Sequence, residues 1–210
     1  MVCLGDWRAF SGDFLKIVGF ENGQWVGLRG LTIHGALIGA VIAVAIYVLW
    51  KKLDFWTWLD VGGPGFVLGQ AIGRWGNFFN QEAYGPPTTL PWGISIGVEH
   101  RIPPYNDLAS YPPTTRFHPT FLYESLMNLA ICLFLLFLAR RYGRYLIRGE
   151  IFCFYGILYG LGRFGMEFLR TDSIMLGPMP AAQVVSLGLV LLCGGVVVAR
   201  RWIWKQPRGA

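Results

Sequence analysis

Hydrophobic positions gather into long stretches that polar segments separate. A helix needs about 20 apolar residues to cross the roughly 30 Å hydrocarbon core of a bilayer. Four stretches approach or meet this length: Ile33–Trp50, Phe121–Ala139, Ile151–Phe168 and Gln183–Ala199. A fifth, Phe55–Ile72, is weaker because it contains Asp60, Gln70 and several glycines, although glycine suits close helix packing in lipid. The pattern therefore predicts an all-α polytopic membrane protein with about five transmembrane helices.

The intervening segments differ in character. Residues 1–30 mix polar and aromatic side chains, and we expect an extracytoplasmic or interfacial segment there. Residues 86–117 hold seven of the twelve prolines, and the stretch PWGISIGV within them alternates like a short strand. We expect this insertion to form a small, irregular extracytoplasmic head on a single membrane domain spanning residues 1–210.

Composition and charge support the membrane interpretation. The chain is 54% hydrophobic and only 14% charged, whereas soluble domains carry about a quarter charged residues. This disfavours a soluble α protein with buried helices. With five spans, three basic clusters fall on one side, which the positive-inside rule identifies as cytoplasmic. They are Lys51 and Lys52; Arg140, Arg141, Arg144 and Arg148; and Arg200, Arg201, Lys205 and Arg208. The N-terminus is then expected outside and the C-terminus inside.

Under this topology, polar side chains from four predicted spans converge on the outer level of the membrane. A charge at mid-bilayer costs about 2.5–3.5 kcal/mol on insertion scales and marks function by default. Tyr159, Arg163 and Glu167 are four residues apart and therefore share one helical face. The whole set, which includes residues just outside the ends of the spans, comprises His34, Arg74, Asn77, Glu82, Gly85, His118, Tyr123, Glu124, Tyr159, Arg163 and Glu167.

Each of these residues also has a purely structural interpretation. Arg163 and Glu167 are spaced as an i,i+4 ion pair, and Arg74 could extend to lipid phosphates without chemistry. His34 could be a structural donor at a helix end, and Glu124 could cap or pair. The amides of Asn77 and Asn80 could satisfy backbone groups at a broken helix end.

Metal and nucleotide chemistry have little support. The three histidines, at positions 34, 100 and 118, lack ligand-like spacing, and no phosphate-binding loop of the P-loop type is present. We expect neither a metal nor a cofactor.

One motif is specific enough to indicate a family. The stretch GRWGNFFNQEAYG closely resembles the signature of bacterial prolipoprotein diacylglyceryl transferases, and every fixed position of that signature is met. HGALIG is similar to that family's HGGLIG box and supplies His34. HPTFLYE resembles its HPSQLYE box and supplies Glu124. The stretch YGLGRFGMEFLR resembles its late-helix motif and supplies Tyr159, Arg163, Glu167 and Arg170. The signature positions are Gly73, Arg74, Gly76, Asn77, Phe78, Asn80, Glu82 and Gly85.

The resemblance implies an activity and its partners. Such enzymes transfer the diacylglyceryl group of phosphatidylglycerol to the lipobox cysteine of a prolipoprotein and release glycerol phosphate, in the bacterial cytoplasmic (inner) membrane. Partners would be phosphatidylglycerol, other membrane lipids and prolipoprotein signal peptides, with no nucleic acid. The thiol belongs to the substrate, so no catalytic cysteine is needed.

Residue roles follow from the chemistry of that reaction. His34 has the intrinsic pKa expected of a general base for the thiol. Arg74 and Arg163 would bind the leaving phosphate, since a guanidinium fork binds phosphate bidentately. Asn77 and Asn80 would donate hydrogen bonds to the headgroup. Gly85 and Tyr159 complete the binding set, and Glu82, Glu124 and Glu167 would orient the arginines and the histidine.

The chain departs from the family in two ways. Members typically have seven spans, and the first two are not matched here. This is expected if Met1 is an internal start of a longer coding sequence, or if the chain is a shortened homologue. Ala36 also stands where glycine is usual. The alternatives are a truncated, catalytically inactive lipid-binding homologue and a small transporter, whose charges would be spread through the bilayer depth.

Overall fold

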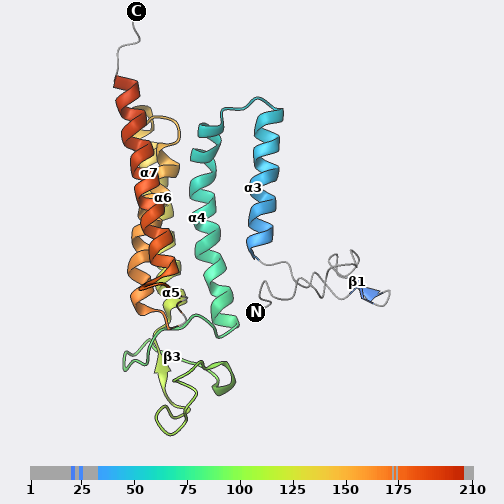
Figure 1. Cartoon of the computed structure of the whole chain (residues 1–210), viewed down its shortest axis with the longest axis vertical. Coiled ribbons are helices and arrows are strands. Elements are labelled where there is room, and N and C mark those ends of the chain that lie inside the picture. Colours follow the sequence, from blue (N-terminus) through green and yellow to red (C-terminus); the bar gives the residue numbers. More distant parts are fainter. Residues whose placement is uncertain (1–19, 22–23, 26–32, 172, 174, 206–210) are drawn as a thin grey trace, which may run out of the picture. The chain divides into compact units, whose positions relative to one another are not determined.

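The computed structural model describes residues 20–21, 24–25, 33–171, 173 and 175–205. The chain forms two compact units, residues 1–55 and 56–210, and each is described by itself. Figure 1 labels the helices α3 to α7 and the strands β1 and β3.

The first unit contains a two-residue hairpin and one long helix. Strand β1 (Phe20–Glu21) pairs antiparallel with β2 (Gln24–Trp25). Helix α3 (Ile33–Trp50) has the bounds predicted for the first apolar stretch. Large apolar side chains of its second half are exposed, including Leu49 and Trp50, as expected of a helix that faces lipid.

The second unit is built on four helices: α4 (Phe55–Phe79), α5 (Thr120–Tyr142), α6 (Glu150–Met166) and α7 (Ala181–Lys205). Three short 3-10 turns, η2 (Val98–His100), η3 (Gly143–Tyr145) and η4 (Glu167–Leu169), lie between them. Each of the last four predicted apolar stretches thus lies largely within a helix. The mostly helical architecture agrees with the expected all-α class.

Within the described residues, two helical segments are long and apolar enough to cross a membrane by length and composition, Thr120–Tyr145 and Ala181–Ile203. Helix α6 has 17 residues, and α4 carries the polar residues noted above. The predicted count of five spans is not confirmed by this criterion and stays a prediction.

Helices α4, α5 and α6 enclose the main apolar core. Val67, Leu135 and Tyr155 contribute to it from the three helices and are almost completely buried. Polar contacts set the register of α4 against α5, because Ser125 Oγ donates to the Ala71 carbonyl at 2.8 Å. The Cys132 thiol lies 3.4 Å from the Pro64 carbonyl, about two helical turns away, and extends that register.

Asp60, which weakened the prediction of a span, joins α4 to the start of α6. Its carboxylate accepts the backbone N–H groups of Gly149 at 2.6 Å and Phe152 at 3.0 Å. The first N–H groups of a helix have no partner within the helix and favour a negative charge. Asp60 therefore has a structural role at the end of the helices opposite the signature motif.

Helices α6 and α7 pack through small residues and one ion pair. A Cβ at Gly160 would lie 2.8 Å from Val190 Cγ2 and 2.9 Å from the Ser186 carbonyl oxygen, so only glycine allows this approach. Near the start of α6, the buried carboxylate of Glu150 accepts two hydrogen bonds from Arg201, at 2.5 and 2.9 Å.

The segment between α4 and α5 contains the expected short strand. It is β3 (Ile94–Ser95), which pairs antiparallel with β4 (Arg116–Phe117). Tyr84, Ile96 and Phe117 form a small separate core here. Arg101 is 6% exposed, and its guanidinium donates to four backbone carbonyls, those of Ile96, Tyr111, Pro112 and Pro113. A third antiparallel pair among the described residues, β5 (Met175–Leu176) with β6 (Met179–Pro180), precedes α7.

Candidate functional site

The signature motif forms the last turns of α4 and the tight bend that follows. The helix continues to Phe79, beyond the predicted end at Ile72. The chain then turns sharply through Gln81 and Ala83, whose φ angles of 51° and 55° lie in the left-handed region. Glu82, between them, accepts hydrogen bonds at 3.1 Å from the side-chain amides of both Asn77 and Asn80. Three predicted site residues therefore form one hydrogen-bonded group.

A second group joins Arg74 to the start of α5. The Arg74 guanidinium lies 2.6 Å from the Glu124 carboxylate, whose side chain is 3% exposed. Arg170, just after η4, lies 3.5 Å from the other carboxylate oxygen. One buried carboxylate thus holds two guanidinium groups from segments nearly 100 residues apart in sequence. Arg170 belongs to the late-helix motif but was not among the predicted site residues.

The third group lies at the end of α6. Arg163 and Glu167 are 2.7 Å apart at i,i+4 spacing, and the carboxylate is 2% exposed. Neither of the two contacting atoms makes an aligned hydrogen bond to any described residue. Both atoms are buried, so their contact is an ion pair closed off from solvent.

Helix η4 connects the second and third groups. It places Glu167 and Arg170 one turn apart, and the Arg170 N–H donates to the Glu167 carbonyl at 3.2 Å. A continuous series therefore runs from Arg74 through Glu124 and Arg170 to Glu167 and Arg163. Three guanidinium groups and two buried carboxylates therefore gather in this part of the described structure. A guanidinium group whose N–H donors are not all used can bind an anion.

The remaining predicted residues of this unit lie around the series. Tyr159, one turn before Arg163, stacks on Tyr155 with ring centroids 5.8 Å apart. Gly85 lies where a Cβ would come within 2.8 Å of both the His118 Cβ and the Leu169 carbonyl oxygen. The packing of the loop against α5 and η4 therefore requires a glycine at this position.

His34 belongs to helix α3 of the first unit, and its side chain lies outside what the structure describes. A second histidine is described in detail. His118 Nδ1 is 3.1 Å from the Tyr123 hydroxyl, which accepts a hydrogen bond from Trp92 Nε1 at 2.9 Å. His118 and Tyr123 lie in the HPTFLYE box, whereas no sequence signal indicated that Trp92 would join them.

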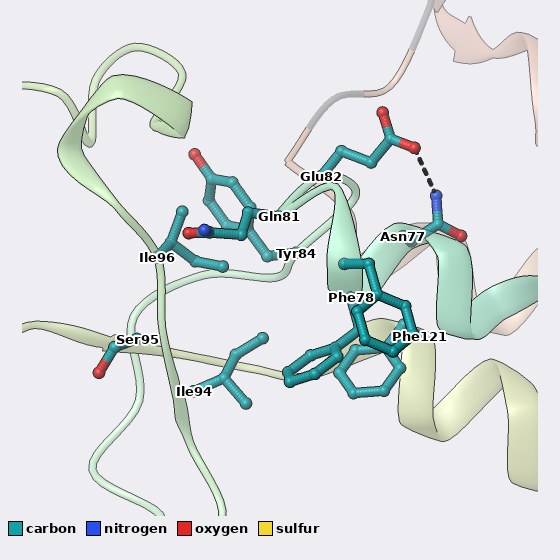
Figure 2. Close-up of a pocket in the computed structure, with 10 residues that line it drawn as sticks. Asn77, Phe78, Gln81, Glu82, Tyr84, Ile94, Ser95, Ile96 and Phe121 are labelled. Carbon is teal, nitrogen blue, oxygen red and sulfur yellow. Dashed lines mark hydrogen bonds between the residues drawn. The ribbon is translucent and has the colours of Figure 1, made fainter.

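A cavity of about 290 Å³ adjoins the first group (Figure 2). Asn77 and Glu82 form its polar end. The rings of Phe78 and Phe121, with centroids 5.0 Å apart, and the side chain of Ile94 form its apolar part. Its other lining residues are Phe79, Gln81, Tyr84, Ser95 and Ile96.

Fold and site together define a helical membrane protein in which three arginines pair with two buried carboxylates at the end of the helices that carries the signature motif. A family model described as prolipoprotein diacylglyceryl transferase matches residues 7–199. The chain therefore belongs to the prolipoprotein diacylglyceryl transferase family.

Curated relatives agree with this membership. The chain is 46% identical to a phosphatidylglycerol–prolipoprotein diacylglyceryl transferase of Chloroflexus aggregans, over 91% of this chain and 66% of the relative. Proteins of the same name from Thermosynechococcus vestitus and Synechocystis sp. are 51% and 49% identical, over 80% and 89% of this chain. These matches cover 59% and 63% of those relatives, so the chain spans a little under two thirds of the length of the relatives it matches.

Proposed function

We propose that this chain transfers the diacylglyceryl group of phosphatidylglycerol to a prolipoprotein cysteine, at the extracytoplasmic face of the bacterial cytoplasmic membrane, as a multi-pass protein. The observation that supports this most is the pairing of three arginines with two buried carboxylates. Phosphatidylglycerol is an anionic lipid, and an arginine cluster at one end of a helical bundle suits its phosphate. The names of the relatives specify the same lipid and acceptor for those proteins.

The reaction requires few protein groups. The cysteine sulfur forms a bond to the terminal glyceryl carbon of the diacylglyceryl group, and the bond from that carbon to a phosphate oxygen breaks. The pair of electrons leaves with glycerol phosphate, and the thiol proton passes to a general base. Charge develops on the leaving phosphate, so catalysis depends on positioned donors around it.

Arg74 is the strongest candidate for binding this phosphate. Its side chain is 22% exposed, more than those of Arg163 at 15% and Arg170 at 14%. Glu124 fixes one amino group of its guanidinium, and a guanidinium has five N–H donors. The other donors can face a ligand while the side chain stays oriented. In this proposal Arg163 assists from the end of α6.

The other predicted residues take supporting roles. Asn77 and Asn80 donate to Glu82, and each amide keeps a second N–H for the glycerol headgroup. Glu124 and Glu167 orient arginines, while Glu82 orients amides. His34 remains our proposal for the base, on the grounds of its intrinsic pKa and its sequence box. Gly85 and Tyr159 shape the site by packing.

Transfer by purified protein tests the proposal. The full chain is reconstituted in liposomes that contain phosphatidylglycerol, and a synthetic peptide with one cysteine is assayed by mass spectrometry. The expected product is the peptide plus one diacylglyceryl group. An Arg74→Lys variant keeps the charge but loses the fork, and we expect a loss of roughly 10²-fold or more in kcat/KM.

Two further measurements separate the roles. His34→Gln should abolish transfer but leave phosphatidylglycerol binding intact, and near-normal transfer would move the base elsewhere. Phosphatidylglycerol binding without any transfer by the unmodified chain would instead indicate an inactive lipid-binding homologue. Glu99→Gln is the control, because this exposed residue pairs only with the neighbouring His100 among the described residues.

A further inference from the structure

The backbone of β3 is paired along one edge. Arg116 and His118 direct their backbone groups toward residues 86–88, since Thr88 N donates to Arg116 O and His118 N donates to Pro86 O. Phe117 lies between them, so its backbone N–H and C=O point to the opposite side, toward β3, where Phe117 pairs with Ile94. Backbone groups of successive strand residues alternate in direction. The N–H and C=O of Ser95 therefore point away from β4, and no described residue pairs with them.

This open edge faces the cavity beside the signature motif. Gly97, two residues beyond Ser95, directs its N–H to the same side and donates to Gln81 Oε1 at 2.7 Å. The Gln81 side chain thus takes the position that a carbonyl of a neighbouring strand would occupy. Ser95 and Gln81 both line the cavity. The strand edge beside Gln81 is therefore open at Ser95 and continuous with the cavity.

The cavity suits an extended peptide with small or apolar side chains. In Figure 2 the Ile94 side chain points toward the rings of Phe78 and Phe121, while the Ser95 side chain points away. An added strand would find the Ser95 backbone at its edge and the aromatic rings beside it. The next residues of the added peptide would lie near the hydrogen-bonded side chains of Asn77 and Glu82 at the polar end of the cavity.

We propose that this cavity binds the acceptor peptide. The peptide residues next to the cysteine are extended and add to the open edge of β3 as a further strand. The inference rests on the proposed function and specifies where its second substrate lies. One N–H and one C=O on a single residue match one residue of an extended peptide, as in β-strand addition. An acyl chain offers neither group. Asn77 lies three residues, about one helical turn, after Arg74. A cysteine thiol of the peptide at the polar end of the cavity would therefore approach a lipid phosphate bound to Arg74.

The test uses a labelled hexapeptide, acetyl-Leu-Ala-Ala-Gly-Cys-Ser-amide, with each backbone amide N-methylated in turn. Binding to the full chain in phosphatidylglycerol nanodiscs is measured by fluorescence anisotropy. Groups on one strand edge recur every second residue. Methylation should therefore weaken binding by about tenfold or more at the amide that faces the Ser95 carbonyl, and leave the two adjacent amides, which point to the other edge, nearly unaffected.

A protein variant gives an independent readout. Ser95→Pro removes the outward N–H and keeps the Ile94–Phe117 pair, and it should raise the Kd of the unmethylated peptide about tenfold without changing phosphatidylglycerol binding. Ser95→Ala is the matched control and should bind normally, because its side chain points away from the cavity. Absence of peptide binding, or equal effects at successive amides, would overturn the inference.

The transfer assay distinguishes the two proposals. Transfer to the unmethylated peptide without a position-specific effect of methylation would retain the proposed function and reject the strand addition. A position-specific effect of methylation on binding, without transfer, would support the peptide site and reject the enzymatic role of this chain.

Discussion

Replacing Glu124 by glutamine should destabilise the helical bundle more than replacing either of its arginine partners. Glu124 lies between Arg74 at 2.6 Å and Arg170 at 3.5 Å. Glutamine keeps the shape and one acceptor oxygen but removes the charge. Arg74 then stays partly buried without the carboxylate that it contacts, and Arg170 loses one charged contact, whereas Arg74→Gln leaves Glu124 still paired with Arg170.

The geometry sets the expected magnitudes. Removing one partner of a buried ion pair costs about 3–5 kcal/mol. The arginine side chains are 22% and 14% exposed and retain some hydration, which places Glu124→Gln near the lower value, about 3 kcal/mol. Arg74→Gln removes one charged contact from a carboxylate that keeps another, a loss of about 1.5–2 kcal/mol. The double variant should cost less than the sum of the two single variants by about 1 kcal/mol.

Reversible unfolding in mixed micelles, followed by tryptophan fluorescence, measures these differences, and Trp75 adjoins Arg74 in sequence. Glu99→Gln is the matched control, since this carboxylate is exposed and should change stability by less than about 0.5 kcal/mol. The reasoning is refuted if Glu124→Gln is as mild as the control, or if Arg74→Gln is the more damaging of the two.

Three other substitutions have clear expectations. Asn128 is completely buried and neither of its amide atoms bonds a described residue, so Asn128→Leu should stabilise the bundle by about 1–2 kcal/mol in the same unfolding assay; a destabilised variant would indicate a missing partner. Gly85→Ala should cost about 1–3 kcal/mol, because the new Cβ would lie 2.8 Å from the Leu169 carbonyl oxygen, and unchanged stability would contradict that contact. Gly160→Ala should separate α6 from α7 at a similar cost, measured as a lower unfolding temperature, whereas Gly165→Ala meets open space and should be neutral.

The sequence predicted the helices better than their ends. The α3 bounds agree because its apolar run ends at Lys51 and Lys52. Helix α4 extends to Phe79 instead of Ile72, since a polar residue such as Arg74 continues a helix as readily as an apolar one. Hydrophobicity reports which residues suit lipid, whereas the helix ends where backbone hydrogen bonding ends.

The site was predictable by residue type but not by partner. The spacing of Arg163 and Glu167 implied their contact, because both lie on one helix. The pairing of Arg74 and Arg170 with Glu124 depends on how α4, α5 and η4 pack, which no local pattern encodes. The contacts of Arg101 with four backbone carbonyls had no sequence signal at all, because an arginine among prolines resembles any surface arginine.

The Asp60 contacts have a consequence far from Asp60 itself. A carboxylate that binds two N–H groups three residues apart fixes both the rotation and the height of α6 relative to α4. Arg74 lies fourteen residues further along α4, roughly 21 Å at 1.5 Å per residue. Helix α4 is continuous from Asp60 to Arg74, with Pro64 inside it, so a misalignment at Asp60 would be passed along this helix and would shift Arg74 against Arg163. The distance between the guanidinium groups of Arg74 and Arg163 therefore depends on Asp60, which lies at the opposite end of the helices from the proposed substrate site.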